Sequence, residues 1–184
     1  MTKNRLETFS DSVMAIVITL LAFELKVPIS KSVDNLQTMQ TLDLLAPQFF
    51  VFVLSFLTIS IMWINHHYIT NKIEIVTHRT VWANSILLMF LSLIPFATSF
   101  LGNNPNNKVA LITYSIVMLF TSLAFTLLKK LAIGKGIRTH GREKFKHIGV
   151  FAYTLAIAVA IFMPPLTYFV LLVPPMSYIL PSKD

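Results

Sequence analysis

Six long apolar segments, separated by short polar stretches, run through the 184 residues of this chain. The hydrocarbon core of a bilayer is about 30 Å thick, so a helix that spans it needs roughly 20 mostly apolar residues. Because lipid offers no hydrogen-bonding partners, the backbone inside it must form helices or a closed barrel. We therefore predict an all-α, polytopic membrane protein with six transmembrane helices in a single domain of residues 1–184. The segments cover residues 9–27, 42–70, 80–101, 109–128, 148–163 and 166–180.

Prolines set the limits of the last two segments. Pro164 and Pro165 separate them, because proline lacks the N–H that a helix interior needs and its ring crowds the preceding turn. Pro174 and Pro175 interrupt the final segment itself. We expect that segment to be kinked or to span only part of the bilayer.

The composition narrows the possible partners and chemistry. Only 12% of the residues are charged, against roughly 25% in soluble domains. The formal net charge of +7 comes from Lys and Arg between the apolar segments, not from a basic face with interleaved aromatic residues. Membrane lipid is therefore the expected partner, and nucleic acid is not. The chain has no cysteine, which excludes disulfides, thiolate zinc sites and cysteine nucleophiles.

The basic residues also predict the orientation in the membrane. If the six segments alternate across the bilayer, only Lys26, Lys31 and Lys108 fall on one side and the other twelve fall on the opposite side. Lys and Arg accumulate on the cytoplasmic side of membrane proteins. We therefore expect a multi-pass protein of the cell membrane with both termini in the cytoplasm. Seven of the twelve lie within residues 129–146 and could also bind anionic lipid headgroups.

The first segment carries ionisable residues at its ends, which are expensive to place against lipid and usually face protein or water. Five of its residues fall on one stripe of a helix by spacing of three and four. The stripe mixes hydroxyl groups with large apolar side chains. From periodicity alone, packing within one subunit is the more common outcome, and lining a pore is the alternative. The stripe consists of Ser12, Ile16, Thr19, Leu20 and Phe23.

A sequence motif stands at the start of the same segment. Arg5, Phe9, Ser10 and Asp11 spell R-x-x-x-F-S-D, which resembles the signature of the transmembrane protein 175 family of potassium channels. The second and third segments hold further residues that are similar to this family. They are Trp63, Asn65, His66, His67, Asn84 and the run Leu-Ile-Pro-Phe at 93–96.

The resemblance implies a potassium-preferring cation channel. It implies a homotetramer of six-helix subunits, with the first helix of each subunit lining a central pore, K⁺ as the permeant ion and no cofactor. It also places a constricting isoleucine at Ile16, with Thr19, Leu20 and Phe23 further along the pore-facing stripe. The sequence TVGYG, which forms the carbonyl filter of common potassium channels, is absent. Selectivity is then expected from rings of side chains that favour the more weakly hydrated K⁺.

Asp11 and its surroundings are expected to hold the first helix in place. A carboxylate within the membrane should have a partner, and Arg5, Ser10, His66 and His67 are the partners that we expect. The two histidines are neighbours, so their side chains point about 100° apart on a helix. Without H-x-x-x-H spacing, we predict no metal site there.

Two other functions remain as alternatives. A secondary transporter or proton-coupled carrier usually shows internal repeats or broken helices, and the sequence suggests neither before Pro164. A membrane enzyme needs a cluster of titratable groups within the bilayer. Only Asp11, His66 and His67 qualify and no nucleophile accompanies them, so we do not expect an enzyme.

Overall fold

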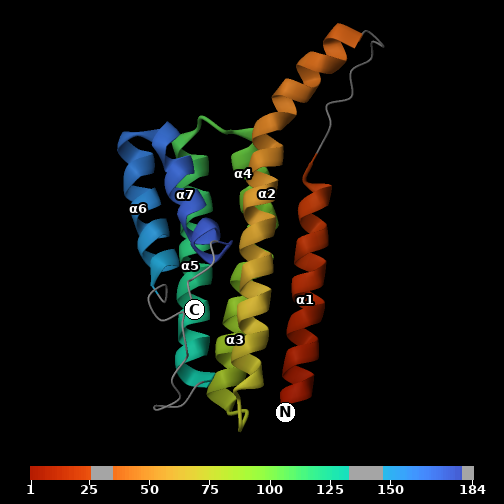
Figure 1. Ribbon diagram of the computed structural model, residues 1–184, viewed down its shortest axis with the longest axis vertical. Coiled ribbons are helices and arrows are strands. Elements are labelled where there is room, and N and C mark those ends of the chain that lie inside the picture. Colours follow the sequence, from red (N-terminus) through yellow and green to blue (C-terminus); the bar gives the residue numbers. More distant parts are fainter. Residues whose placement is uncertain (26–34, 133–146, 180–184) are drawn as a thin grey trace.

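The computed structural model describes residues 1–25, 35–132 and 147–179. All regular secondary structure in these ranges is α-helical (Figure 1). The prediction of an all-α fold is therefore confirmed. The helices are α1 (Lys3–Phe23), α2 (Asn35–Asn71), α3 (His78–Ser92), α4 (Ile94–Asn103), α5 (Lys108–Ala132), α6 (Ile148–Phe162) and α7 (Pro164–Ile179).

Among the described residues, four stretches of helix are long and apolar enough to cross a bilayer. α6 and α7 are apolar but have only 15 and 16 residues, which is about 23 Å of helix at roughly 1.5 Å per residue. A polytopic helical membrane protein is thus confirmed, whereas full spanning by the last two segments stays a prediction. The four stretches are α1, Leu45–Asn71 of α2, the combined run His78–Asn103 of α3 and α4, and α5.

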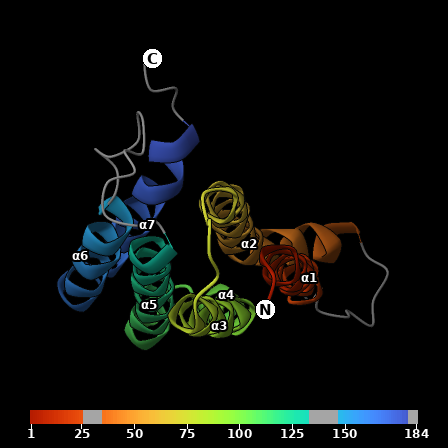
Figure 2. The same ribbon diagram turned by 90° about the horizontal axis from the view of Figure 1, so that it is seen from below.

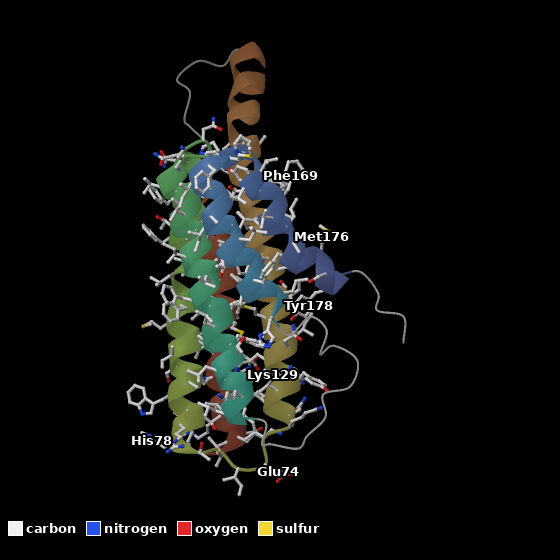
Figure 3. The ribbon with its side chains drawn as sticks, turned by 90° about the vertical axis from the view of Figure 1, so that its left-hand side faces the viewer. Glu74, His78, Lys129, Phe169, Met176 and Tyr178 are labelled. Carbon is white, nitrogen blue, oxygen red and sulfur yellow. The ribbon has the colours of Figure 1, made fainter. Side chains whose placement is uncertain are left out.

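Prolines act differently at the two ends of α7. Pro164 and Pro165 lie in its first turn, where proline is tolerated because the N–H groups there have no partner within the helix. Pro174 and Pro175 lie inside the helix. Beyond them the last turns, near Met176, lean away from the bundle (Figure 3), in keeping with the interruption expected from the sequence.

The third apolar segment is two helices and not the single one that the sequence suggested. α3 ends at Ser92 and α4 starts at Ile94. Pro95 explains the break, because it has no N–H to donate to the carbonyl four residues earlier and its ring crowds that carbonyl. Leu93 instead donates its N–H to Phe90 O, three residues back, at 3.1 Å. A broken helix therefore does occur before Pro164, contrary to the sequence interpretation.

The helices form a bundle in which α1 lies at one edge. Figure 2 shows α1 beside α2 and the α3–α4 pair, with α5, α6 and α7 on the far side. The N-terminus, Glu74 and the start of α3 at His78 lie at one end of the bundle (Figures 1 and 3). The C-terminal ends of α1 and α4 lie at the other end (Figure 1). This arrangement leaves one side of α1 without a neighbour in the described part of the subunit.

Candidate pore helix and its anchoring contacts

Helix α1 has one face that is buried in the subunit. It contains no glycine or proline, and its buried side chains recur every three or four residues, the spacing of a single helix face. Through this face α1 packs against α2, α3 and α4. The buried residues are Leu6, Ser10, Met14, Val17 and Leu21.

The predicted stripe lies on the other side of α1 and is exposed. The side chains of Ile16, Leu20 and Phe23 have exposed fractions of 58%, 44% and 76%. Ser12 and Thr19 are exposed as well. Their hydroxyl groups donate to carbonyls of their own helix, Ser12 to Thr8 at 2.8 Å and Thr19 to Ile16 at 2.8 Å. The hydroxyl oxygens therefore keep acceptor capacity, and the stripe is not packed inside its own subunit.

A buried chain of three polar side chains ties α1 to α3 and α2. Asn84 Nδ2 donates to Ser10 Oγ at 2.9 Å, and Ser10 Oγ in turn donates to Leu6 O at 2.9 Å. His66 Nε2 lies 2.8 Å from Asn84 Oδ1. All three side chains are at most 1% exposed. We call His66, Asn84 and Ser10 the polar relay.

The directions of the hydrogen bonds in the polar relay follow from its chemistry. Because the Asn84 amide nitrogen donates to Ser10, the Asn84 oxygen faces His66 and can only accept. His66 Nε2 must therefore carry a proton. His66 Nδ1 is buried and has no hydrogen-bond partner among the described residues.

A second set of contacts joins α1 to α2 at intervals of one helical turn. The two helices run antiparallel, so each step of four residues along α1 is matched by four residues back along α2. We call these contacts the α1–α2 clamp. They are Lys3 Nζ donating to Asn71 O at 2.9 Å, His67 Nδ1 with Glu7 Oε1 at 2.8 Å, and Trp63 Nε1 donating to Asp11 Oδ1 at 2.9 Å.

The predicted partners of Asp11 are wrong. Its carboxylate accepts a hydrogen bond from Trp63, while Ser10 and His66 bond to Asn84 and His67 bonds to Glu7. In the described part of the chain no ion pair joins Asp11 to Arg5, which is exposed. Geometry explains this, because residues six apart on a helix point about 120° away from each other.

Of the other predicted site residues, Phe9 lies on α1, and His66 and His67 lie on α2. Phe9 is 52% exposed, on the side of the stripe. His66 and His67 diverge as expected for neighbours on a helix, since His66 is fully buried and the His67 side chain is 56% exposed. Sequence reasoning gave Glu7 no role. A signal for the role of Glu7 was present in the sequence. Glu7 and Asp11 are four residues apart, and so are Trp63 and His67, which is the spacing of one helical turn on each helix.

These features define a class of protein: a polytopic helical membrane protein whose first helix is held by polar contacts on one face and is uncovered on the other. The family described as endosomal/lysosomal potassium channel TMEM175 matches residues 5–95. A potassium channel of Chryseobacterium sp. (strain P1-3) is 36% identical over 170 residues, which cover 89% of this chain and 85% of that protein. The endosomal/lysosomal proton channel TMEM175 of Homo sapiens is 29% identical over 136 residues, covering 69% of this chain and 27% of the human protein.

A solved structure extends the likeness to almost the whole chain. It is described as a crystal structure of a lysosomal potassium-selective channel TMEM175 homolog from Chamaesiphon minutus. The TM-score is 0.87 at 32% sequence identity, and the match covers 99% of this chain and 98% of that one. The chain belongs to the TMEM175 family, a family of ion channels and not of enzymes. The resemblance inferred from the R-x-x-x-F-S-D motif is therefore confirmed.

Proposed function

We propose that this chain forms a homotetrameric, potassium-preferring cation channel whose pore is lined by four copies of α1. The observation that carries the proposal is the exposed stripe of α1, opposite a face held by the polar relay and the α1–α2 clamp. The exposed side of this helix carries hydroxyl groups among its apolar residues. Such a mixed surface suits contact with water or ions better than contact with lipid alone. The printed names of the bacterial relatives support a potassium pathway.

Several copies are needed because one stripe of one helix cannot enclose a path for ions. Four stripes facing a common axis would form rings of side chains, one ring for each position. Elsewhere the subunit exposes large apolar side chains, such as Phe151, Phe162 and Phe169, that suit contact with lipid acyl chains. Membrane lipid and three further subunits are thus the proposed partners.

The proposed constriction is the ring of four Ile16 side chains. An isoleucine offers no oxygen to replace the water that an ion loses, so a narrow apolar ring imposes a dehydration cost on every ion. K⁺ holds its water less tightly than Na⁺ and meets the smaller cost. Thr19, about one turn along, has a hydroxyl whose hydrogen is donated to Ile16 O, so its oxygen is free to face a cation.

We also propose six spans, both termini in the cytoplasm and placement in the cell membrane. Within the described residues, the end of the bundle that holds the N-terminus also holds Lys3, Arg5, Lys72 and Arg79, whereas Lys108 lies at the other end. Reporters fused after the last residue and inserted in the loop 104–107 should lie on opposite sides of the membrane. Finding both reporters on the same side would mean that the number of spans between them is even, which would contradict the proposed six spans.

Ion flux through purified protein in liposomes tests the proposed function. K⁺ flux down a gradient should exceed Na⁺ flux and should not saturate at carrier-like turnover. Proton flux, recorded with a pH-sensitive dye, is a useful parallel measurement because the human relative carries the name of a proton channel. Saturable, slow turnover would favour the secondary transporter or proton-coupled carrier, and no flux in folded tetramers would contradict the channel.

A further inference from the structure

Helices α3 and α5 form an outer surface of the subunit away from the proposed pore helix. Figure 2 shows α5 on the side of α3 opposite α1, and α3 and α5 pack against each other. They run antiparallel, because α3 begins and α5 ends at the end of the bundle that holds the N-terminus (Figure 1). The rings of Phe90 and Phe120 stack across the two helices with centroids 5.3 Å apart, which places these residues at one level.

The middle of this surface is apolar. Large side chains of both helices are exposed on it, and such side chains on membrane-spanning helices suit contact with lipid acyl chains. We call it the α3–α5 surface. Its exposed side chains are Ile86 and Met89 of α3 and Phe120, Leu123 and Leu127 of α5.

Two cationic side chains lie where this apolar surface ends. Arg79 is eleven residues before Phe90, and Lys130 is ten residues after Phe120. These separations are about 16 and 15 Å at roughly 1.5 Å per residue. Because the helices are antiparallel, both displacements point toward the same end of the bundle. Arg79 and Lys130 therefore lie at nearly the same level on neighbouring helices.

Both cations also lie on the exposed side of their helices. Arg79 is seven residues, or about two turns, from Ile86, and Lys130 is the same distance from Leu123. The Arg79 and Lys130 side chains are exposed. Packed helix axes are about 8–10 Å apart, which is within the combined reach of two long, flexible side chains. One small anionic group can therefore contact both.

The positive charge of this pair is not neutralised within the described part of the subunit. No carboxylate among the described residues forms an ion pair with Arg79 or Lys130, and this includes Glu74 in the loop before α3. Two neighbouring cations without a counter-ion favour an anionic ligand.

Trp82 indicates where this end of the surface lies relative to a bilayer. It is about one turn from Arg79, its side chain is 59% exposed, and its Nε1 donates to Nε2 of His78 at 3.2 Å. His78 marks the start of α3 at this end of the bundle (Figure 3). Tryptophan is enriched at the level of the lipid headgroups. The two cations therefore lie at the level of the lipid phosphates.

We propose that the α3–α5 surface binds an anionic phospholipid, with its phosphate between Arg79 and Lys130 and an acyl chain along the apolar side chains. Basic groups between transmembrane helices bind anionic headgroups, and a guanidinium binds phosphate oxygens through two parallel N–H bonds. The apolar surface beside the cations favours a lipid over free phosphate. The site lies outside the stripe of α1 and does not depend on α1 lining a pore.

Fluorescence tests this lipid site, because the chain has only two tryptophans, Trp63 and Trp82. Trp63→Phe leaves Trp82 as the single tryptophan. The purified variant is placed in phosphatidylcholine vesicles with a small fraction of phosphatidylglycerol or phosphatidylcholine brominated on the acyl chains. Bromine quenches tryptophan at short range, so brominated phosphatidylglycerol should quench Trp82 at a lower mole fraction. In Trp82→Phe, which keeps Trp63 on α2, the two lipids should quench equally.

Charge variants in the Trp63→Phe background locate the headgroup. Arg79→Gln and Lys130→Gln should each raise the mole fraction of phosphatidylglycerol for half-maximal quenching about fivefold. Lys72→Gln is the matched control, because it removes the same charge at the same end of the bundle, where Lys72 Nζ lies over the Tyr68 ring at 4.3 Å. It should leave the preference unchanged.

Three results would overturn the proposal. Equal quenching of Trp82 by the two brominated lipids would mean that no anionic lipid is preferred there. Equal losses in Arg79→Gln, Lys130→Gln and Lys72→Gln would mean diffuse attraction to the whole basic end of the bundle. Displacement of phosphatidylglycerol by inorganic phosphate, compared with chloride at the same ionic strength, would mean that the cations bind free phosphate and not a lipid.

Discussion

Asn84 links the two ends of the polar relay, so replacing it with leucine tests how α1 is held. Leucine has the same branched side-chain skeleton as asparagine, but it carries two larger methyl groups in place of the amide and offers no hydrogen bond. In Asn84→Leu, the His66 Nε2–H loses its acceptor in a fully buried position, and Ser10 keeps only its donation to Leu6 O. The perturbation thus leaves one buried donor unpaired while the branched shape of the side chain is kept.

The expected loss of stability follows from that single donor. Leaving a buried donor unpaired costs about 1–3 kcal/mol, more than the net contribution of a hydrogen bond between two satisfied groups. The ratio of folded to unfolded protein should fall by roughly 5- to 150-fold. Asn65→Leu is the matched control, because among the described residues the Asn65 Nδ2 hydrogen bond is made to Ile61 O of its own helix, at 2.8 Å.

Denaturant titration of the purified protein in detergent, followed by helical circular dichroism, measures these differences. Combining Asn84→Leu with His66→Phe removes both partners, and the pair of apolar groups should restore part of the lost stability. The reasoning would be refuted if Asn84→Leu were as stable as Asn65→Leu. It would also be refuted if the double variant showed the full sum of the two single losses.

Three further predictions test the two faces of α1. Ile16→Asn should raise ion flux and lower the K⁺ preference, because four amides would admit water to the ring. The control Ile116→Asn, on the exposed surface of α5, should change neither the flux nor the K⁺ preference. Equal selectivity of the two variants in liposome flux measurements would exclude the Ile16 ring. Trp63→Phe should remove the hydrogen bond to Asp11 and lower the unfolding free energy by about 0.6–1.7 kcal/mol, and an unchanged denaturation curve would make that bond incidental. Since the chain has no cysteine of its own, Ile16→Cys should react with a water-soluble thiol reagent and Val17→Cys should not; the reverse pattern would mean that α1 is rotated.

The sequence was most informative about features that depend on the backbone alone, namely the length of apolar segments and the positions of prolines. Apolar segments of sufficient length predicted the helices of the membrane domain, and Pro164 and Pro165 correctly separated the last two segments. Pro95 produced a similar break between α3 and α4, but a single proline inside a long apolar run can also be accommodated within a kinked helix. Which outcome occurs depends on the packing around it, and this packing is not visible in hydropathy.

Partner assignments were harder to predict than helices. Asp11 was expected to pair with Arg5, Ser10 or one of the imidazoles of His66 and His67, because an ionisable group within a membrane usually has a partner. Its partner is instead the indole of Trp63, which lies at the matching height of the antiparallel neighbour. The choice depends on the register between α1 and α2. Register follows from packing, so the spacing from Glu7 to Asp11 becomes informative only once the neighbouring helix is known.

The motif F-S-D makes physical sense as a device that fixes the rotation of α1. Three consecutive residues on a helix point in directions about 100° apart, and here each meets a different environment. Phe9 is exposed, Ser10 is buried against Asn84, and Asp11 bonds to Trp63 on α2. The contacts of Ser10 and Asp11 point in two different directions from α1, so together they fix its rotation about its own axis. They therefore also determine which residues face outward further along α1. A rotation by one residue would replace Ile16 on the exposed side with a neighbour and would break both contacts at once. Ser10 and Asp11, neither of which lies on the stripe, thus determine which side chains the exposed face of α1 presents.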